Sequence, residues 1–313
     1  MLPALQSAGR HYQLLNFARE SWFICKNGPN SAIATTRYKN PLEPREQSTR
    51  RSSIEMATGD GKITAVVFGA SGSVGQAVCR ALANLKPYGH IISINRSRKL
   101  DWMESLSIKA TQVVLSREDF QDLKKIRQVT AKVCKDHGAT HAFSSLGIGT
   151  KTGSITKEQH RAVDVETNRA FALGCSDSKL VTSMVFLSSV SADPNANENG
   201  SGTAGGSRYL RVKGESEEAV KAAGIRNCRI IRPAMIKGSQ NTPCILECME
   251  PCCWYACCLF ACLPSKFHSI DVDELGVAMG IAGIEEAAES PGNLNIEYDK
   301  IVGILSLRSK YIR

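Results

Sequence analysis

The sequence has no apolar run long enough to cross a membrane. Its longest apolar stretch, residues 252–263, covers about a dozen positions, whereas a membrane-spanning helix needs ~20. The first residues also have no long apolar core of the kind found in secretory signal peptides, and the chain is long for a disulfide-stapled domain. We therefore expect a soluble protein, or one attached at most to a membrane surface, whose twelve cysteines are not a disulfide framework.

The chain also has no dense basic helix and no stripe of alternating basic and aromatic residues. Its formal charge of +9 includes eight Lys/Arg and four Asp/Glu in residues 1–55, which leaves +5 for the rest. We expect no nucleic-acid partner. Repeats of the solenoid kind are absent as well.

The first 55 residues differ in composition from the rest. They are rich in Ser/Thr, hold only Glu20 as an acid before position 40, and contain Arg10, Arg19, Arg37, Arg45, Arg50 and Arg51. Such a composition is typical of an organelle transit peptide. Two alternatives remain. The segment could be a plain disordered extension, or the start could be misassigned, with Met56 as the true first residue. We expect residues 1–60 to be an extension of the folded domain. We expect the protein to be cytoplasmic, or mitochondrial or plastid if the transit peptide is real.

From residue 63 onward, short apolar runs alternate with helical segments. The runs cover residues 63–68, 90–94, 112–115, 141–146, 180–187 and 228–231. Strands that alternate with helices indicate a parallel sheet covered on both faces. The pattern predicts an α/β fold over residues 61–313, a doubly wound parallel sheet (Rossmann fold), with a small substrate-pocket region from about residue 238 to the end.

The first chemical motif is GASGSVG, directly after the first predicted strand. Gly69 permits a tight turn, Gly72 lets a pyrophosphate approach the backbone, and Gly75 allows the next helix to pack close to the sheet. The helix N-terminus then points at the phosphates. Further backbone N–H groups come from Ser71, Ser73 and Val74. Because the motif lies between a strand and a helix, it predicts a dinucleotide site.

The second predicted strand ends in the cationic segment NRSRK, residues 95–99. An NAD-specific site would have an Asp or Glu at this distance from the glycines, to bind the ribose 2′-hydroxyl. Arg96 and Arg98 instead suit a 2′-phosphate, which the planar guanidinium binds through two hydrogen bonds. The segment therefore predicts NADP(H). The alternative is that some of these cations only belong to a solvated loop, Lys99 before the others.

The third motif is a YxxxK sequence that opens a predicted helix. A spacing of four places Tyr209 and Lys213 on one helix face, where the ammonium stabilises the phenolate. Tyr209 could then exchange a proton with a substrate oxygen near neutral pH. The preceding strand ends in Ser188 and Ser189, whose hydroxyls could hold the same oxygen. The alternative is that Tyr209 only packs and Lys213 is solvated.

Together these motifs resemble the short-chain dehydrogenase/reductase family over residues 62–240. Within it they are most similar to the atypical group that contains the Tat-interacting oxidoreductase. The similar segments are GASGSVG, NRSRK, SSLG (144–147), LSS (187–189), YLRVKGE (209–215) and IIRPAMI (230–236).

The resemblance implies roles for the catalytic positions. Tyr209 would be the proton donor or acceptor, and Lys213 its activator and a ligand of the nicotinamide ribose. Ser189 is most similar to the substrate-orienting serine, with Ser188 and Ser191 as alternatives because the register after the strand is ambiguous.

The resemblance also implies further cofactor contacts. Leu146 and Gly147 match the backbone that passes the adenine-ribose side, and Pro233 matches the segment beside the nicotinamide. Asn168 is similar to the asparagine that kinks the corresponding helix in many relatives, although a surface helix residue is an equal explanation.

Two segments depart from the family pattern. Residues 192–206 form a polar, glycine-rich insertion, expected to be a mobile loop over the active site or a disordered insertion. Ala234 stands where relatives often have glycine after the proline, which puts the backbone of the nicotinamide segment in question.

Seven cysteines are unexplained by the resemblance: Cys244, Cys248, Cys252, Cys253, Cys257, Cys258 and Cys262. Their spacing differs from that of zinc sites, so no metal is expected. Three readings stay open: packing as small apolar residues over the substrate pocket, palmitoylation with peripheral membrane contact, and redox sensing.

The sequence thus predicts hydride transfer between NADPH and a small carbonyl or alcohol, with Tyr209 as acid/base and Ser189 holding the oxygen. An NADPH-binding sensor or protein-interaction scaffold without turnover is the alternative. A sugar epimerase would need tightly held NAD, which Arg96 and Arg98 disfavour. The sequence makes no prediction of oligomeric state or of the individual substrate.

Overall fold

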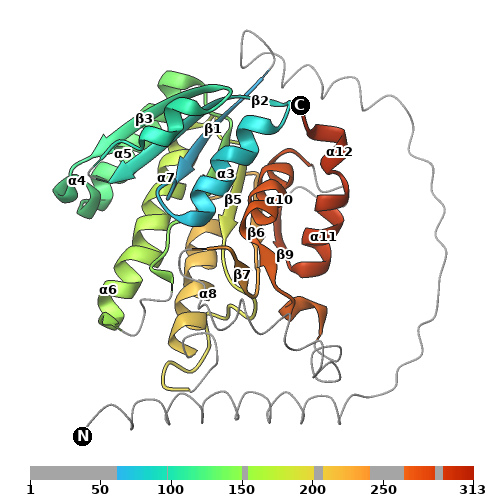
Figure 1. Ribbon diagram of the computed structural model, residues 1–313. Coiled ribbons are helices and arrows are strands. Elements are labelled where there is room, and N and C mark those ends of the chain that lie inside the picture. Colours follow the sequence, from blue (N-terminus) through green and yellow to red (C-terminus); the bar gives the residue numbers. More distant parts are fainter. Residues whose placement is uncertain (1–61, 97, 150–153, 201–206, 240–263, 286–291) are drawn as a thin grey trace, which may run out of the picture.

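The computed structural model describes residues 62–96, 98–149, 154–200, 207–239, 264–285 and 292–313 (Figure 1). Its centre is a seven-stranded sheet in the order β3-β2-β1-β4-β5-β6-β9, in which every neighbouring pair is parallel. The strands are β1 (Ile63–Phe68), β2 (Tyr88–Arg96), β3 (Lys109–Leu115), β4 (His141–Ser144), β5 (Ser183–Leu187), β6 (Asn227–Ile231) and β9 (Asn293–Ile296). The strand order reverses at β1, which confirms the predicted doubly wound sheet.

Helices cover both faces of this sheet. On one face α3 packs against α10, with α11 and α12 beside them, and on the other lie α5, α7 and α8. Their bounds are α3 (Ser73–Asn84), α4 (Arg117–Gln121), α5 (Leu123–His137), α6 (Lys157–Arg161), α7 (Asn168–Ser178), α8 (Ser207–Lys221), α10 (Val272–Ile284), α11 (Tyr298–Ser306) and α12 (Arg308–Tyr311). None of these described helices is long and apolar enough to span a membrane.

Several short elements complete the described chain. They are the 3-10 helices Asp101–Ser105 and Ser265–Phe267, the π-helix Ala162–Thr167 between α6 and α7, and a two-stranded parallel sheet of β7 (Ile236–Lys237) and β8 (Ile270–Asp271).

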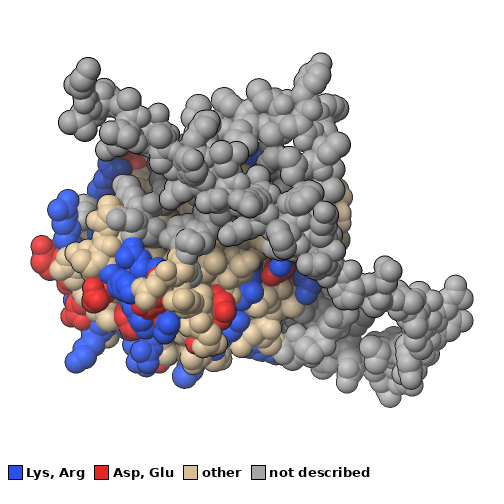
Figure 2. Space-filling model, turned by 90° about the horizontal axis from the view of Figure 1, so that it is seen from below, with Lys and Arg blue, Asp and Glu red and all other residues tan. Residues whose placement is uncertain are grey.

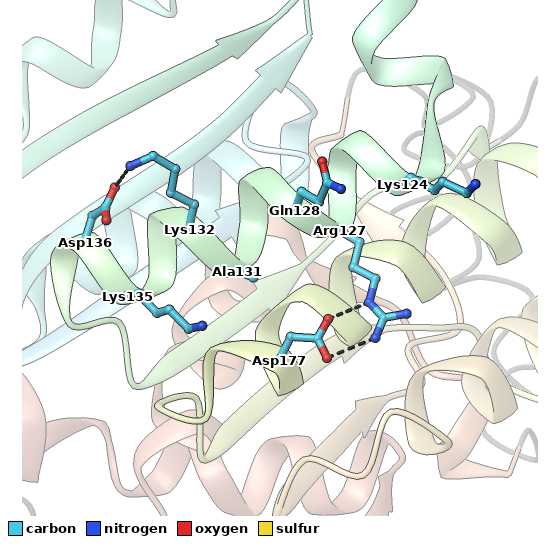
Figure 3. Close-up of a pocket in the computed structure, with 8 residues that line it drawn as sticks. All are labelled: Lys124, Arg127, Gln128, Ala131, Lys132, Lys135, Asp136 and Asp177. Atoms are coloured by element: carbon cyan, nitrogen blue, oxygen red, sulfur yellow. Dashed lines mark hydrogen bonds and ion pairs between the residues drawn. The ribbon is translucent and has the colours of Figure 1, made fainter.

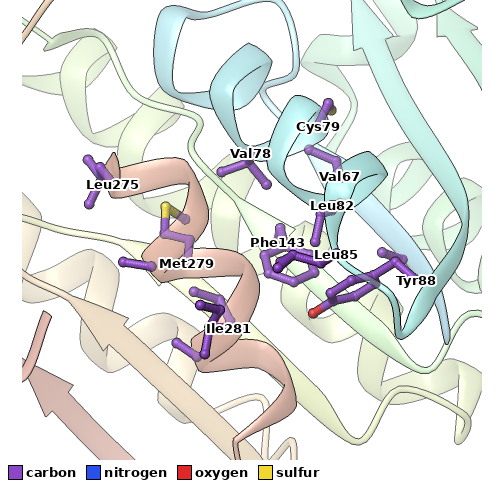
Figure 4. Packing of buried hydrophobic residues seen from close by; sticks show 14 of the residues in the cluster. Val67, Val78, Cys79, Leu82, Leu85, Tyr88, Phe143, Leu275, Met279 and Ile281 are labelled. Carbon is purple, nitrogen blue, oxygen red and sulfur yellow. The ribbon is translucent and has the colours of Figure 1, made fainter. Parts of the chain in front are cut away.

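Helices α3 and α10 pack closely together and cover the hydrophobic core on one face of the sheet (Figure 4). A Cβ built on Gly276 would lie 2.6 Å from the carbonyl carbon of Ala77, so only glycine permits this approach. One turn on, the Tyr88 hydroxyl donates to the carbonyl oxygen of Gly280 at 2.8 Å. Because this hydrogen bond satisfies the buried hydroxyl, the Tyr88 ring can pack in the core without leaving a polar group unpaired.

The C-terminal part, from about residue 238, contributes to the same sheet. Strand β9 pairs with β6, and α10 packs on α3, so both belong to the central fold. The sequence reading did not foresee either element. A separate substrate-pocket region stays a prediction. The extension 1–60 and the cysteines at 244–262 lie outside the described residues.

Candidate active site

The glycine turn joins β1 to α3 at the carboxyl end of the sheet. Gly69 has φ +90°, and a Cβ there would lie 2.7 Å from the amide nitrogen of Leu146. A Cβ on Gly75 would lie 2.1 Å from the carbonyl oxygen of Gly69, so the helix could not pack here with a larger residue. Gly72 is exposed and caps α3 without a side chain. The turn thus presents an uncovered helix N-terminus, which fits a pyrophosphate.

The predicted 2′-phosphate ligands lie at the end of the neighbouring strand. Arg96 is the last residue of β2, and its guanidinium lies 5.7 Å from the ring centroid of Phe120. Phe120 in turn stacks on Phe68, the last residue of β1, at 5.5 Å between centroids. Arg96 is therefore tied to the strand that leads into the glycine turn. Arg98 is exposed, and its amide donates to the Arg96 carbonyl at 3.0 Å.

Next along the edge, the segment after β4 meets α8. A Cβ on Gly147 would lie 3.0 Å from Nζ of Lys213 and 3.1 Å from Oδ2 of Asp164. Gly147 itself is exposed, whereas Lys213 is buried. Gly147 therefore lies close to both the Lys213 ammonium and the Asp164 carboxylate.

Asn168 is completely buried, which rules out the surface reading. The π-helix Ala162–Thr167 directly precedes it and widens the helix by one residue. Nδ2 of Asn168 donates to the carbonyl oxygens of Asp164 at 2.8 Å and Leu146 at 3.2 Å. Its Oδ1 accepts from the Ser144 hydroxyl at 2.6 Å. Asn168 thereby fixes the segment after β4 to the distorted helix.

Tyr209 and Lys213 project from the first turns of α8, as predicted. The Lys213 ammonium lies 5.9 Å from the centroid of the Tyr209 ring. The other neighbour of the phenol is His160 on α6, whose ring is nearly parallel at 6.3 Å between centroids. The Tyr209 hydroxyl makes no hydrogen bond to the described part of the chain. It is therefore available to a substrate oxygen.

Lys213 forms a buried ion pair with Asp164, 3.1 Å from Nζ to Oδ2. Burial disfavours the charged amine, but Asp164, Tyr209 and Glu217 together outweigh burial, with Asp164 the main contributor, so the pKa of Lys213 is raised. Burial likewise disfavours the charged Asp164, but the Lys213 ammonium, His160 and the Ile148 amide together reverse this effect, so the pKa of Asp164 is lowered. Both groups are therefore charged at neutral pH.

The serines after β5 are held between β6 and α8. The amide of Val190 donates to the Pro233 carbonyl at 2.9 Å, and the amide of Asp193 donates to the Leu210 carbonyl at 3.1 Å. These bonds bring Ser189 beside both Pro233 and the start of α8. The Ser189 side chain is buried, and its hydroxyl has no hydrogen-bond partner among the described residues.

The two alternative serines have other surroundings. The Ser188 hydroxyl donates to Oε1 of Glu217 at 2.5 Å, and Glu217 also accepts two hydrogen bonds from Arg232, at 2.8 and 2.6 Å. Ser191 is exposed and has φ +60°. The geometry therefore favours Ser189 as the substrate-orienting serine.

Ala234 is accommodated without strain. Among the described non-glycine residues only Lys179 and Ser191 have positive φ, so position 234 does not need glycine. Pro233 before it is buried and held by Val190.

The first part of the insertion, residues 192–200, is anchored on α6 and α8. Glu198 lies 2.9 Å from Lys157, 3.4 Å from Arg211 and 3.7 Å from Arg161. A Cβ on Gly214 would lie 2.2 Å from the backbone nitrogen of Pro194, so the loop rests directly on α8. This part thus packs against α6 and α8, and the predicted mobile loop over the active site stays a prediction. Residues 201–206 lie outside the described residues.

Surface features away from this edge are less specific. Figure 2 looks onto the molecule from below, and on the described part of that face cations and anions lie intermixed. A hollow of about 600 Å³ lies on α5 and α7 (Figure 3). It is lined by Lys124, Arg127, Gln128, Ala131, Lys132, Lys135, Asp136 and Asp177. None of the predicted site residues lines it.

Comparison with known proteins bears on the fold. No family model and no curated protein matches the sequence. Solved structures do match. The fold is that of short-chain dehydrogenases/reductases.

Three of these structures illustrate the match. The 3-oxoacyl-[acyl-carrier protein] reductase from Brucella melitensis in complex with NAD has 14% identity and a TM-score of 0.57, over 77% of this chain and 98% of that one. The NADPH-dependent 3-quinuclidinone reductase from Rhodotorula rubra has 16% identity and a TM-score of 0.55, over 86% and 100%. A short-chain type dehydrogenase/reductase from Mycobacterium ulcerans has 17% identity and a TM-score of 0.53, over 77% and 90%.

Sequence reasoning missed three buried residues of this site. Asp164, His160 and Glu217 are all at most 2% exposed. The one available signal was the placement of Asp164 between Val163 and Val165, because a carboxylate flanked by apolar residues needs a buried partner. His160 and Glu217 resemble ordinary surface helix residues in the sequence.

Proposed function

We propose that this chain is an NADP(H)-dependent oxidoreductase of the short-chain dehydrogenase/reductase type, acting on a small carbonyl or alcohol. The observation that carries the proposal is one continuous edge of the sheet. Along it lie the glycine turn, Gly147 over Lys213, then Tyr209, and Ser189 beside Pro233. A dinucleotide laid along the carboxyl ends of parallel strands would contact them in that order.

The residues of this edge fit the cofactor. The glycines let the turn and α3 pack closely together, and the α3 N-terminus would attract the charge of the phosphates. Arg96 and Arg98 would hold a 2′-phosphate, which favours NADP(H) over NAD(H). The fold neighbours include proteins described with NAD and with NADPH, so the arginines carry this choice.

In the proposed reduction the bound nicotinamide supplies a hydride to the carbonyl carbon. Ser189 donates a hydrogen bond to the carbonyl oxygen and orients it. Tyr209 gives its phenolic proton to that oxygen, which becomes the alcohol hydroxyl. Lys213 stabilises the resulting phenolate through its positive charge and holds the ribose of the cofactor. The reverse oxidation uses the same groups, with Tyr209 as the base.

Substitution of Tyr209 by Phe tests the proposal. The ring and its stacking on His160 are kept, so binding of NADPH should be unchanged. Turnover of a panel of small ketones and aldehydes should fall by about 10³-fold or more, because the proton donor is gone. NADPH binding without turnover by the wild-type protein would instead support the sensor or scaffold function.

A further inference from the structure

Asp164 is a carboxylate with no solvent exposure that connects the cofactor edge to the catalytic helix. Its Oδ1 accepts from the amide of Ile148 at 2.9 Å, in the segment that follows β4. Its Oδ2 lies 3.1 Å from Nζ of Lys213 on α8. A buried carboxylate is costly unless it is paired and hydrogen-bonded, and here both of its oxygens are engaged.

The backbone around Asp164 is shaped to hold this position. It lies within the π-helix Ala162–Thr167, where the regular helical hydrogen bonds are displaced. The Asp164 carbonyl oxygen accepts instead from Nδ2 of Asn168 at 2.8 Å and from the hydroxyl of Ser216 at 2.9 Å. Two side chains from two helices thus fix the residue that carries the carboxylate.

The charges around this carboxylate are few in the described structure. His160 on α6 has its Nε2 3.8 Å from Oδ2, beyond a hydrogen bond. On α8, Tyr209 and Glu217 lie close enough to Lys213 to act on its charge. The α6 cations point elsewhere and pair with carboxylates of the insertion and of α8: Lys157 with Glu198, and Arg161 with Glu198 and Glu215. Lys213 is therefore the cation whose charge Asp164 compensates.

We propose that Asp164 is a positioning residue for Tyr209 and Lys213: it is the fixed counter-ion that keeps the buried Lys213 charged and aimed at the cofactor edge. Its consequence for turnover rests on the proposed function. Without the carboxylate, burial would favour the neutral amine. A neutral amine is a weaker donor to a ribose hydroxyl and cannot stabilise the Tyr209 phenolate.

Substitution of Asp164 by Asn in the full chain tests this role, because the amide can still accept from Ile148 but carries no charge. NADPH affinity is measured by fluorescence titration from about pH 6.5 to 9.5. The wild-type Kd should vary little between pH 7 and 9, whereas the Asp164→Asn Kd should rise by about tenfold as Lys213 loses its proton. Where a carbonyl is reduced, the alkaline limb of kcat should move to lower pH by about one unit, and Asp164→Glu should restore most of it.

Asp177→Asn is the matched control. It makes the same change in an exposed ion pair, with Arg127, and should behave as wild type at every pH. An Asp164→Asn protein whose Kd has the wild-type pH dependence would overturn the proposal.

Thermal unfolding tests the counter-ion directly, even where Asp164→Asn does not fold. Lys213→Met leaves Asp164 charged and alone, whereas the double variant Asp164→Asn/Lys213→Met removes both charges. The double variant should melt at a higher temperature than Lys213→Met. Equal or lower melting temperatures would overturn the proposal. A wild-type protein that reduces no carbonyl would refute the proposed reaction, while these melts and the NADPH titrations would still decide the role of Asp164.

Discussion

The hydroxyl of Ser188 donates to Oε1 of Glu217 at 2.5 Å, inside a buried network that also holds Arg232. The Ser188 hydroxyl is therefore taken up by Glu217, and we propose that Ser189 is the serine that meets a substrate. Because Glu217 follows Lys213 by one helical turn, the same network fixes α8 against the ends of β5 and β6.

The different roles of the two serines predict different effects: Ser189→Ala should lower activity, and Ser188→Ala should lower stability. Ser189→Ala should lower kcat for a reduced carbonyl by about 10²-fold to 10³-fold with little change in melting temperature, because it removes a donor to the reacting oxygen. Ser188→Ala should lower the free energy of unfolding by about 1–3 kcal/mol, because Glu217 loses a buried donor. Steady-state kinetics and thermal melts on both variants check this, and the reverse pattern would assign the substrate to Ser188.

Cofactor preference should depend on the two arginines after β2. Removing Arg96 or Arg98 by Ala should weaken NADPH binding by about tenfold or more and leave NADH binding unchanged, because only NADPH has the 2′-phosphate. Lys99→Ala in the same exposed segment is the control and should alter neither affinity. Titration of each variant with both cofactors measures the effect. If the affinity fell equally for NADPH and NADH, these arginines would contact a part of the cofactor other than the 2′-phosphate.

The glycine turn should not tolerate a methyl group. Gly75→Ala places a Cβ 2.1 Å from the Gly69 carbonyl oxygen, so α3 must shift away from the turn. We expect lower melting temperature and loss of NADPH binding. Gly303→Ala in α11 is the control: its Cβ would meet no atom within 4 Å, and it should keep or slightly raise stability. NADPH binding by a stable Gly75→Ala protein would contradict the packing described here.

Acid should destabilise the fold through a partly buried histidine, His141. Burial lowers the pKa of His141 from 6.5 to about 4, and the backbone of Gly283 offsets this only in part. Between those pH values the unfolded chain binds a proton that the folded protein excludes, so stability falls as pH decreases from 6.5 toward 4, by up to about 3 kcal/mol. His141→Gln should flatten this dependence in urea titrations. The buried His90, whose pKa is also lowered to about 4 by burial and by the nearby Lys109 and His137, leaves a residual slope.

Much of the described fold between residues 62 and 239 could be predicted, because strong local patterns agreed with the fold. Strand β1 begins and ends where the apolar run does, and the YxxxK helix matches α8. By contrast, α10 was missed because it is apolar on nearly every side and has no helical periodicity to read. Strand β9 is a short, half-polar segment that is recognisable only through its pairing with β6.

The chemistry divides in the same way. Tyr209 and Lys213 are four residues apart on one helix, so their proximity follows from the helical repeat. Asp164 reaches Lys213 across 49 residues of sequence, through a π-helix that no local pattern foretold. The register of the serines also needed the structure, because only the bond to Glu217 separates Ser188 from Ser189.

Fluorescence titration of the full chain with NADPH and NADH, for wild type and Tyr209→Phe, tests the central claim most directly. We expect tighter binding of NADPH than of NADH, equal NADPH affinity in the two proteins, and carbonyl turnover by the wild type alone. Absence of NADPH binding by the wild type would contradict the proposed NADP(H)-dependent function.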